Sequence, residues 1–242
     1  MKYVVIATAL VLTTIGAQAA PQKATKSAAA KPGAKPALKP QPAPVPAVWY
    51  DFKGARLGMT MDEWRAVAPP ALAMPVEAPP QIICSNEPDN KDKIGLHIYQ
   101  SDDDRKIGVV ECQYFVERQY IGLRSAYLKV GDGGSEDISY KFLDGKLYSI
   151  VILSSDNLLS GIVEGLNAKF GPPTSVVNDT TQNKAGATFP HAVKLWENPV
   201  AIIRLEAPYS KIDNMSVTYY TVEGLNKYST AEKVLHPAAD KM

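Results

Sequence analysis

The stretch ISYKFLDGKLYSIVILS (138–154) contains two alternating apolar segments separated by Asp144-Gly145. A two-residue hairpin turn needs positive φ at both central positions, which Asp and Gly tolerate better than most residues. The stretch therefore predicts a β-hairpin that turns at these two residues. Because side chains alternate between the two faces of a strand, we expect Tyr140 and Phe142 to share one face.

An amphipathic helix is expected directly after this hairpin, in SDNLLSGIVEGLNAKFGPP (155–173). Ser155 or Asp156 is the expected N-cap, and Gly171 before two prolines is the expected end. The apolar residues follow the spacing of one helical face, which should pack on a sheet. They are Leu159, Ile162, Val163, Leu166 and Phe170.

Further strands are indicated by short β-branched or aromatic segments bounded by turn residues. The segments are GLHIYQ (95–100), IGVVECQYFV (107–116), TSVVND (174–179), AVKLWE (192–197), VAIIRLEA (200–207) and MSVTYYTV (215–222). Asn198-Pro199 is expected to tighten a second hairpin.

SDDDRK (101–106) is interpreted as the connection between the first two of these strands. Its Asp102–Asp104 run is interpreted as a solvated hairpin tip, with calcium binding as the alternative because carboxylate oxygens cluster there. VGDGGSED (130–137) is expected to be a flexible loop, because it lacks the Lys-Ser/Thr ending of a phosphate-binding loop.

Another short helix is expected over 61–68, within LGMTMDEW (57–64) and the residues that follow. Thr60 is a natural N-cap, and Glu63 can reach back to the amide of Thr60, as in a capping box. Pro69-Pro70 ends the helix. The Thr-x-x-Glu pattern is thus explained by helix capping and not by catalysis.

The order of elements predicts an α+β fold of two similar halves, each a short helix packed on antiparallel strands. The folded domain is placed at 48–228 with the boundary between halves near 130–137, and residues 229–242 are expected to form a flexible tail.

LGMTMDEW, together with FLDGKLYSIVI (142–152) and LNAKFGPPTS (166–175), resembles small exported bacterial α+β modules. These are of the outer-membrane assembly lipoprotein (SmpA/OmlA) type and the β-lactamase-inhibitor-protein type. The resemblance implies a helix packed on an antiparallel sheet and a non-catalytic binding surface. It assigns no functional residue, and the lipid-attachment Cys of the lipoproteins is absent here.

The N-terminal residues 1–20 have the plan of a secretory signal peptide: Lys2, an apolar run from Tyr3 to Ile15, and Ala17-Gln18-Ala19. The alternative is that this segment stays uncleaved and anchors the protein in a membrane. Membrane association is expected only in that case. Residues 21–47 are rich in Lys, Ala and Pro, so they are expected to form an extended, disordered linker.

The charge is divided unevenly. Six of the 26 basic residues precede residue 48 and no acidic residue does, which leaves 20 basic and 25 acidic residues in the rest of the chain. Nucleic acid is an improbable partner for such an acidic body, because phosphate contacts need a basic face.

The two cysteines, Cys84 and Cys112, are expected to form one disulfide. In the chain-entropy account, closing such a loop stabilises the fold by roughly 3 kcal/mol. A redox role would call for Cys-x-x-Cys spacing, which is absent.

Catalytic and metal-binding patterns are sparse in this sequence. His97, His191 and His236 each lack a second His or Cys within five residues, so no zinc pattern is present. His97 is interpreted as a sheet residue, His191 as a loop residue and His236 as part of the tail. Neither Gly-x-Ser-x-Gly nor Ser-x-x-Lys occurs. No catalytic residue, cofactor or metal is assigned.

Aromatic residues at the two ends of the expected domain are the candidate binding surface: Trp49, Tyr50, Tyr219 and Tyr220. Alternation predicts that one of the two adjacent tyrosines points inward and the other outward. These observations predict a bacterial periplasmic or secreted protein, a non-catalytic binding module for a protein or a cell-envelope component. The alternatives are a cell-envelope hydrolase with dispersed catalytic residues and a membrane-anchored spacer.

Overall fold

A computed structural model describes residues 47–76, 78–87, 98, 100–135 and 137–237. The strands are β1 (Asp51–Phe52), β2 (Ala55–Arg56), β3 (Gln81–Cys84), β4 (Val110–Arg118), β5 (Gly122–Ser125), β6 (Leu128–Val130), β7 (Gly133–Ser135), β8 (Asp137–Leu143), β9 (Lys146–Ser155), β10 (Ser175–Gln182), β11 (Thr188–Glu197), β12 (Ala201–Ala207) and β13 (Asn214–Thr221). The helices are α1 (Met61–Arg65), α2 (Asp102–Ile107), the 3₁₀ helix η2 (Asp156–Leu158), α3 (Leu159–Phe170) and α4 (Val222–Leu235).

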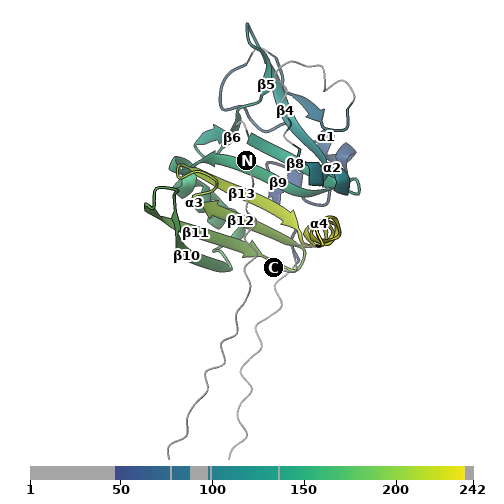
Figure 1. Cartoon of the computed structure of the whole chain (residues 1–242). Helices are drawn as coiled ribbons and strands as arrows, with labels where there is room; N and C mark the ends of the chain where they lie inside the picture. Colours follow the sequence, from purple (N-terminus) through teal and green to yellow (C-terminus); the bar gives the residue numbers. More distant parts are fainter. Residues whose placement is uncertain (1–46, 77, 88–97, 99, 136, 238–242) are drawn as a thin grey trace, which may run out of the picture. The chain divides into compact units, whose positions relative to one another are not determined.

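Nine of the described strands build one large antiparallel sheet, while β1 with β2 and β6 with β7 form two separate two-stranded sheets (Figure 1). The large sheet has the order β10-β11-β12-β13-β9-β8-β4-β3, and β5 pairs with β4 as its ninth strand. At its centre β9 pairs with β8 on one side and with β13 on the other. The predicted β8–β9 hairpin is confirmed: Asp144 has φ 52° and Gly145 has φ 73°.

The predicted fold class was wrong. We expected two helix-plus-sheet halves, but one sheet runs through both of them, and strands dominate over four short α-helices in the described residues. The error came from β4 and β8. Their pairing joins the two expected halves directly, for example Cys112 with Tyr140, so one sheet continues across the region near 130–137.

Each face of this sheet has its own apolar cluster, because successive side chains of a strand point to opposite sides. Trp64 of α1 is fully buried on the first face, with its ring centroid 4.7 Å from that of Tyr140 and 5.3 Å from that of Phe142. Ile162 and Leu166 of α3 belong to the same cluster. On the second face Val109, Leu143 and Tyr148 pack together, with Tyr228 of α4 and Ile107 of α2 against them.

Several local expectations also need correction. SDDDRK is not a hairpin tip: Ser101 caps α2, its Oγ accepting a hydrogen bond from the Asp104 amide at 3.0 Å. Residues 130–135 belong to the β6–β7 hairpin and are not a flexible loop. Residues 229–235, expected to be frayed, form the second half of α4. The short helix ends at Arg65 and not at residue 68.

Other expectations lie outside the described residues: the signal peptide, most of the linker, most of the strand at 95–100, and His97. Within the described part, each helix falls short of the length and apolar character that a bilayer-spanning helix needs.

Candidate functional site

Trp49 and Tyr50 point in different directions although they are neighbours. The Tyr50 side chain is buried, with its ring centroid 4.8 Å from that of Phe170, and burial raises the pKa of its hydroxyl. Trp49 is 40% exposed, whereas Trp64 and Trp196 are buried. Of the two predicted binding residues at this end, Tyr50 is part of the core and only Trp49 offers an aromatic surface.

Two contacts position Trp49. The side-chain amide of Asn198, in the turn between β11 and β12, donates to the carbonyl oxygen of Val48 at 2.7 Å. The ring of Trp49 also lies beside Gly58, where an added Cβ atom would be 3.5 Å away, in ordinary van der Waals contact. Gly58 has φ 84°, a backbone conformation that favours glycine and that sets the course of the chain beside the ring.

Trp49 lines a cavity of about 270 Å³, which we call the Trp49 pocket. Its walls come from three separate parts of the chain: the segment before α1, the β8–β9 hairpin, and the first turns of α4. Its apolar side is formed by Leu57, Leu143, Leu147 and Tyr148, all buried side chains. An apolar hollow with an aromatic wall and a few polar groups is the usual form of a ligand site.

Charged side chains surround the Trp49 pocket. Lys227 Nζ lies 3.0 Å from Asp144 Oδ2 and 3.1 Å from Glu223 Oε1, and the hydrogen bonds to these carboxylates raise the pKa of Lys227. Arg56 and Lys146 also line the pocket and are exposed, but neither forms an ion pair with another described residue. Their two positive charges are therefore available to a ligand.

Thr60 and Glu63 lie next to this pocket and form a capping box. Thr60 Oγ1 accepts from the Glu63 amide at 3.2 Å, and Glu63 Oε2 accepts from the Thr60 amide at 2.7 Å. The bond from the Thr60 backbone lowers the pKa of Glu63, and Arg56 and Lys146 add smaller contributions. Both cap residues serve α1, and Thr60 also forms a β-bridge with Lys146 at the pocket.

The other aromatic pair is separated from the Trp49 pocket. Tyr219 is 4% exposed in the core of the first face, and its ring centroid is 6.2 Å from that of Phe52. Tyr220 is partly exposed and belongs to the second face, as alternation predicts. Tyr219 is not available to a ligand, and the structure does not bring the two tyrosines together with Trp49.

The predicted disulfide between Cys84 and Cys112 is present, and it joins directly opposed residues of β3 and β4. Both cysteines are completely buried. The bond ties an edge strand to the sheet, which is an architectural role.

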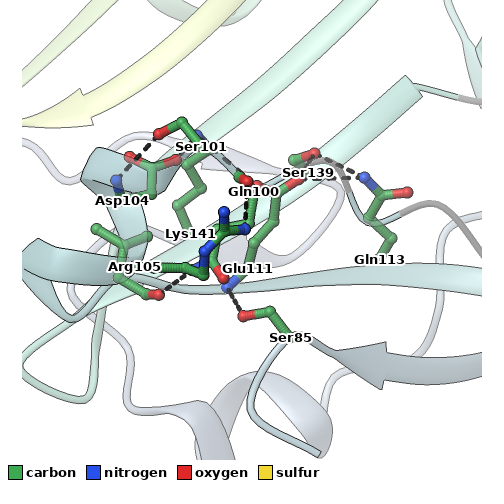
Figure 2. Close-up of polar contacts among 10 residues, drawn as sticks. Ser85, Gln100, Ser101, Asp104, Arg105, Glu111, Gln113, Ser139 and Lys141 are labelled. Carbon is green, nitrogen blue, oxygen red and sulfur yellow. Dashed lines mark hydrogen bonds and ion pairs between the residues drawn. The ribbon is translucent and has the colours of Figure 1, made fainter. Parts of the chain in front are cut away.

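A buried ionic network connects α2 with β4 and β8 (Figure 2). Lys141 Nζ lies 2.8 Å from Asp104 Oδ2 and 3.7 Å from Glu111 Oε2, and both acids are buried. Burial alone would lower the pKa of Lys141, but the two carboxylates outweigh it and the pKa is raised.

Neighbouring side chains complete this network. Ser139 Oγ donates to Glu111 Oε1 at 2.6 Å, and Gln113 Nε2 donates to the same oxygen at 3.2 Å. Asp104 reaches the sheet from α2, while Lys141 stands on β8, so their ion pair fixes the helix to the second face. We interpret the network as structural, because each of its charged groups already has an ion-pair partner within it.

His191 lies in β11 and not in a loop, between Asp179 and Glu206. Its Nδ1 contacts Asp179, and its Nε2 lies 3.1 Å from Glu206 Oε1. Partial burial lowers the pKa of His191. The hydrogen bonds to the two carboxylates and their negative charges raise it by more than burial lowers it, so the net change in the pKa is upward. Because carboxylates engage both ring nitrogens, neither is free to take a proton from a substrate.

The Asp102–Asp104 run is already neutralised by cations. Asp102 pairs with Arg105, Asp103 lies 3.8 Å from Lys106 Nζ and 2.9 Å from His236 Nε2, and Asp104 pairs with Lys141. This pairing leaves no carboxylate of the run free for calcium. Within the described residues, no group of His, Cys, Asp and Glu side chains has an arrangement that could hold a metal.

Comparisons with protein-family models, with curated proteins and with solved structures gave no match. Sequence patterns pointed to Trp49 but missed Arg56, Lys146 and Lys227. No motif relates these three, because the fold brings them together from β2, β9 and α4.

Proposed function

We propose that the protein is an exported, non-catalytic binding module whose ligand site is the Trp49 pocket. Its ligand is a protein or a cell-envelope component. One observation carries this proposal: a half-exposed Trp49 lines an apolar cavity that also presents two unpaired cations, Arg56 and Lys146. Exposed tryptophan beside a preformed hollow is typical of binding sites, since the ring offers a large contact area at little entropic cost.

Export is supported by the signal-peptide pattern and by the buried disulfide. Disulfides persist in oxidising compartments such as the bacterial periplasm and are rare in the cytosol. The resemblance to exported bacterial modules remains a prediction, and it points to the same compartment.

A binding role explains the polar clusters better than hydrolysis does. The Asp104–Lys141–Glu111 network is closed on itself, and both ring nitrogens of His191 are taken by carboxylates. Neither cluster leaves a base free beside the cavity at Trp49. The envelope hydrolase is therefore the less favoured alternative.

Site-specific photo-crosslinking in the producing cells tests this proposal. A photoreactive residue at Glu223, which lines the pocket, is exposed and leaves both cations in place, should form an adduct with the ligand, and the added substitution Trp49→Ala should abolish that adduct. A photoreactive residue at Tyr120, which is 93% exposed and is not one of the residues that line the pocket, is the matched control. Adducts at Glu223 that persist without Trp49, or adducts only at Tyr120, would contradict a site at the pocket.

A further inference from the structure

A shallow apolar groove continues the Trp49 pocket along α4. The groove has a volume of about 580 Å³ and shares Leu143, Asp144 and Lys227 with the pocket. The ion pair between Asp144 and Lys227, 3.0 Å apart, therefore lies where pocket and groove meet. Together they form one elongated surface.

The groove itself is apolar. Besides the shared residues, it is lined by Ile107 at the end of α2 and by Ala231 and Val234 on α4. Val234 is 75% exposed, which is high for a valine side chain on a helix that packs against the sheet. Asn226 and Thr230 add polar groups, and the Asn226 side chain has no hydrogen-bond partner among the described residues. An amide of this kind can pair with either the N–H or the C=O of a peptide backbone.

The charges along this surface are asymmetric. The pocket lining holds Arg56 and Lys146, both without an ion pair in the described part of the chain, together with Lys227 and its two partners Asp144 and Glu223, whereas the groove beyond the shared Asp144–Lys227 pair is lined by uncharged residues. An anionic group is therefore attracted to Arg56 and Lys146 beside Trp49 and finds no further cation along the groove. The junction acids instead favour N–H donors or a positive charge.

From this arrangement we propose that the ligand is a peptide with an apolar segment and a carboxylate at one end. This inference rests on the proposed function and names the ligand of the same site. The carboxylate lies in the Trp49 pocket at Arg56 and Lys146, the backbone crosses the Asp144–Lys227 pair, and the apolar side chains occupy the groove along α4. A simple anion or a phosphate headgroup would use the two cations but would leave the apolar groove and the junction acids without a role.

Two sources supply a carboxylate of this kind: the free C-terminus of a peptide and the side chain of Asp or Glu. Three synthetic peptides distinguish them. The first has a Leu-Ile-Phe end with a free terminal carboxylate, the second has the same end amidated, and the third is amidated but has Asp in place of Phe. Their affinities are measured with the full mature protein by isothermal titration calorimetry.

The amidated Leu-Ile-Phe peptide should bind at least about tenfold more weakly than the free acid, because it lacks the charge-assisted contact. Recovery of affinity by the Asp peptide would identify a side-chain carboxylate as the source, and no recovery would identify the C-terminus. The double variant R56Q/K146Q should bind the acidic and amidated peptides alike. Val234→Ser should weaken all three peptides equally, since it affects only the apolar groove.

Equal affinity of the acidic and amidated peptides would overturn the proposal, as would binding to vesicles of phosphatidylglycerol and phosphatidylcholine without binding to any peptide. These failures differ from failure of the proposed function. If the photo-adduct at Glu223 depends on Trp49 but no peptide binds, the site is right and the ligand class is wrong. If the adduct is independent of Trp49, the site itself is wrong. Circular dichroism of R56Q/K146Q, whose side chains are exposed, verifies that the variant folds.

Discussion

The side-chain amide of Asn198 lies 2.7 Å from the carbonyl oxygen of Val48, a hydrogen bond that spans 150 residues of sequence. It fixes the segment that carries Trp49 to the turn between β11 and β12. The carbonyl oxygen of the same side chain accepts from the amides of Val200 and Ala201, both at 3.0 Å. One side chain thus shapes a hairpin and positions the binding aromatic.

Asn198→Asp separates these two roles, because a carboxylate keeps the acceptors but loses the donor. We expect Trp49 to become more accessible, with a larger acrylamide quenching constant for its fluorescence. The melting temperature should change little. Asn198→Ala should raise the quenching constant as well and should also lower the melting temperature, since it removes the turn contacts too. Unchanged quenching in Asn198→Asp would mean that the bond to Val48 does not hold Trp49.

Charged quenchers measure the field at the pocket. Trp49 is the exposed tryptophan, while Trp64 and Trp196 are buried, so collisional quenching reports mainly on Trp49. Unpaired Arg56 and Lys146 should concentrate anions there, so iodide should quench more effectively than caesium at low salt. R56Q/K146Q should reduce this difference. Equal quenching by the two ions in the unaltered protein would show that the cations exert no field at Trp49.

Removing the cation of the buried network should destabilise the fold strongly. Lys141→Met leaves Asp104 and Glu111 buried without their counter-charge, which costs about 3 kcal/mol or more. Urea denaturation measures the loss in the free energy of unfolding. Lys129→Met, at an exposed lysine of β6, is the matched control and should stay within about 0.5 kcal/mol of the unaltered protein. Similar losses in the two variants would contradict the structural role of the network.

The stability contributed by His191 should depend on pH. Its folded pKa is raised above the ordinary value, so its contribution is fully present below the unfolded pKa of about 6.5 and is lost as pH rises through the folded pKa. The free energy of unfolding should therefore differ more between the unaltered protein and His191→Gln at pH 5.5 than at pH 9. A difference that is constant across this range would indicate that His191 gains no proton affinity on folding.

Local structure followed from the sequence where a short pattern dictates backbone geometry. The Asp144-Gly145 turn, the capping box at Thr60 and the apolar face of α3 are of this kind. The missed helix α2 obeys the same rule, since Ser101 followed by acidic residues is an N-cap signal. The prediction of a hairpin tip failed because a run of three Asp residues is typical of a solvated turn as well as of a first helical turn. In the structure Asp104 is buried against Lys141.

Long-range pairing could not be inferred in the same way. Nothing in β4 or β8 specifies that they pair with each other, and that pairing turns two expected halves into one sheet. A register shift between Lys141 and Phe142 adds a further uncertainty. On the β9 side of this shift, Leu147 belongs to the apolar cluster of the first face and Tyr148 to that of the second. Strict alternation counted from the turn therefore predicts the wrong face of the sheet for Ser149.

Only part of the candidate site could be predicted from the sequence, for the same reason. Trp49 was identified by type and position, but Tyr50 and Tyr219 proved to be core residues. The pocket forms only where Arg56, Lys146 and Lys227 lie close together in the fold. Their separations in the sequence do not predict that proximity.

The most direct test of a ligand site at Trp49 is the set of three tryptophan indole N–H signals in a ¹H–¹⁵N NMR spectrum. Spectra of the mature protein are recorded before and after addition of a solubilised cell-envelope fraction, and Trp49→Phe assigns one signal. We predict that the signal of Trp49 shifts or broadens while those of the buried Trp64 and Trp196 stay in place. A Trp49 signal that is unmoved at saturating envelope fraction, with changes only elsewhere in the spectrum, would contradict the account.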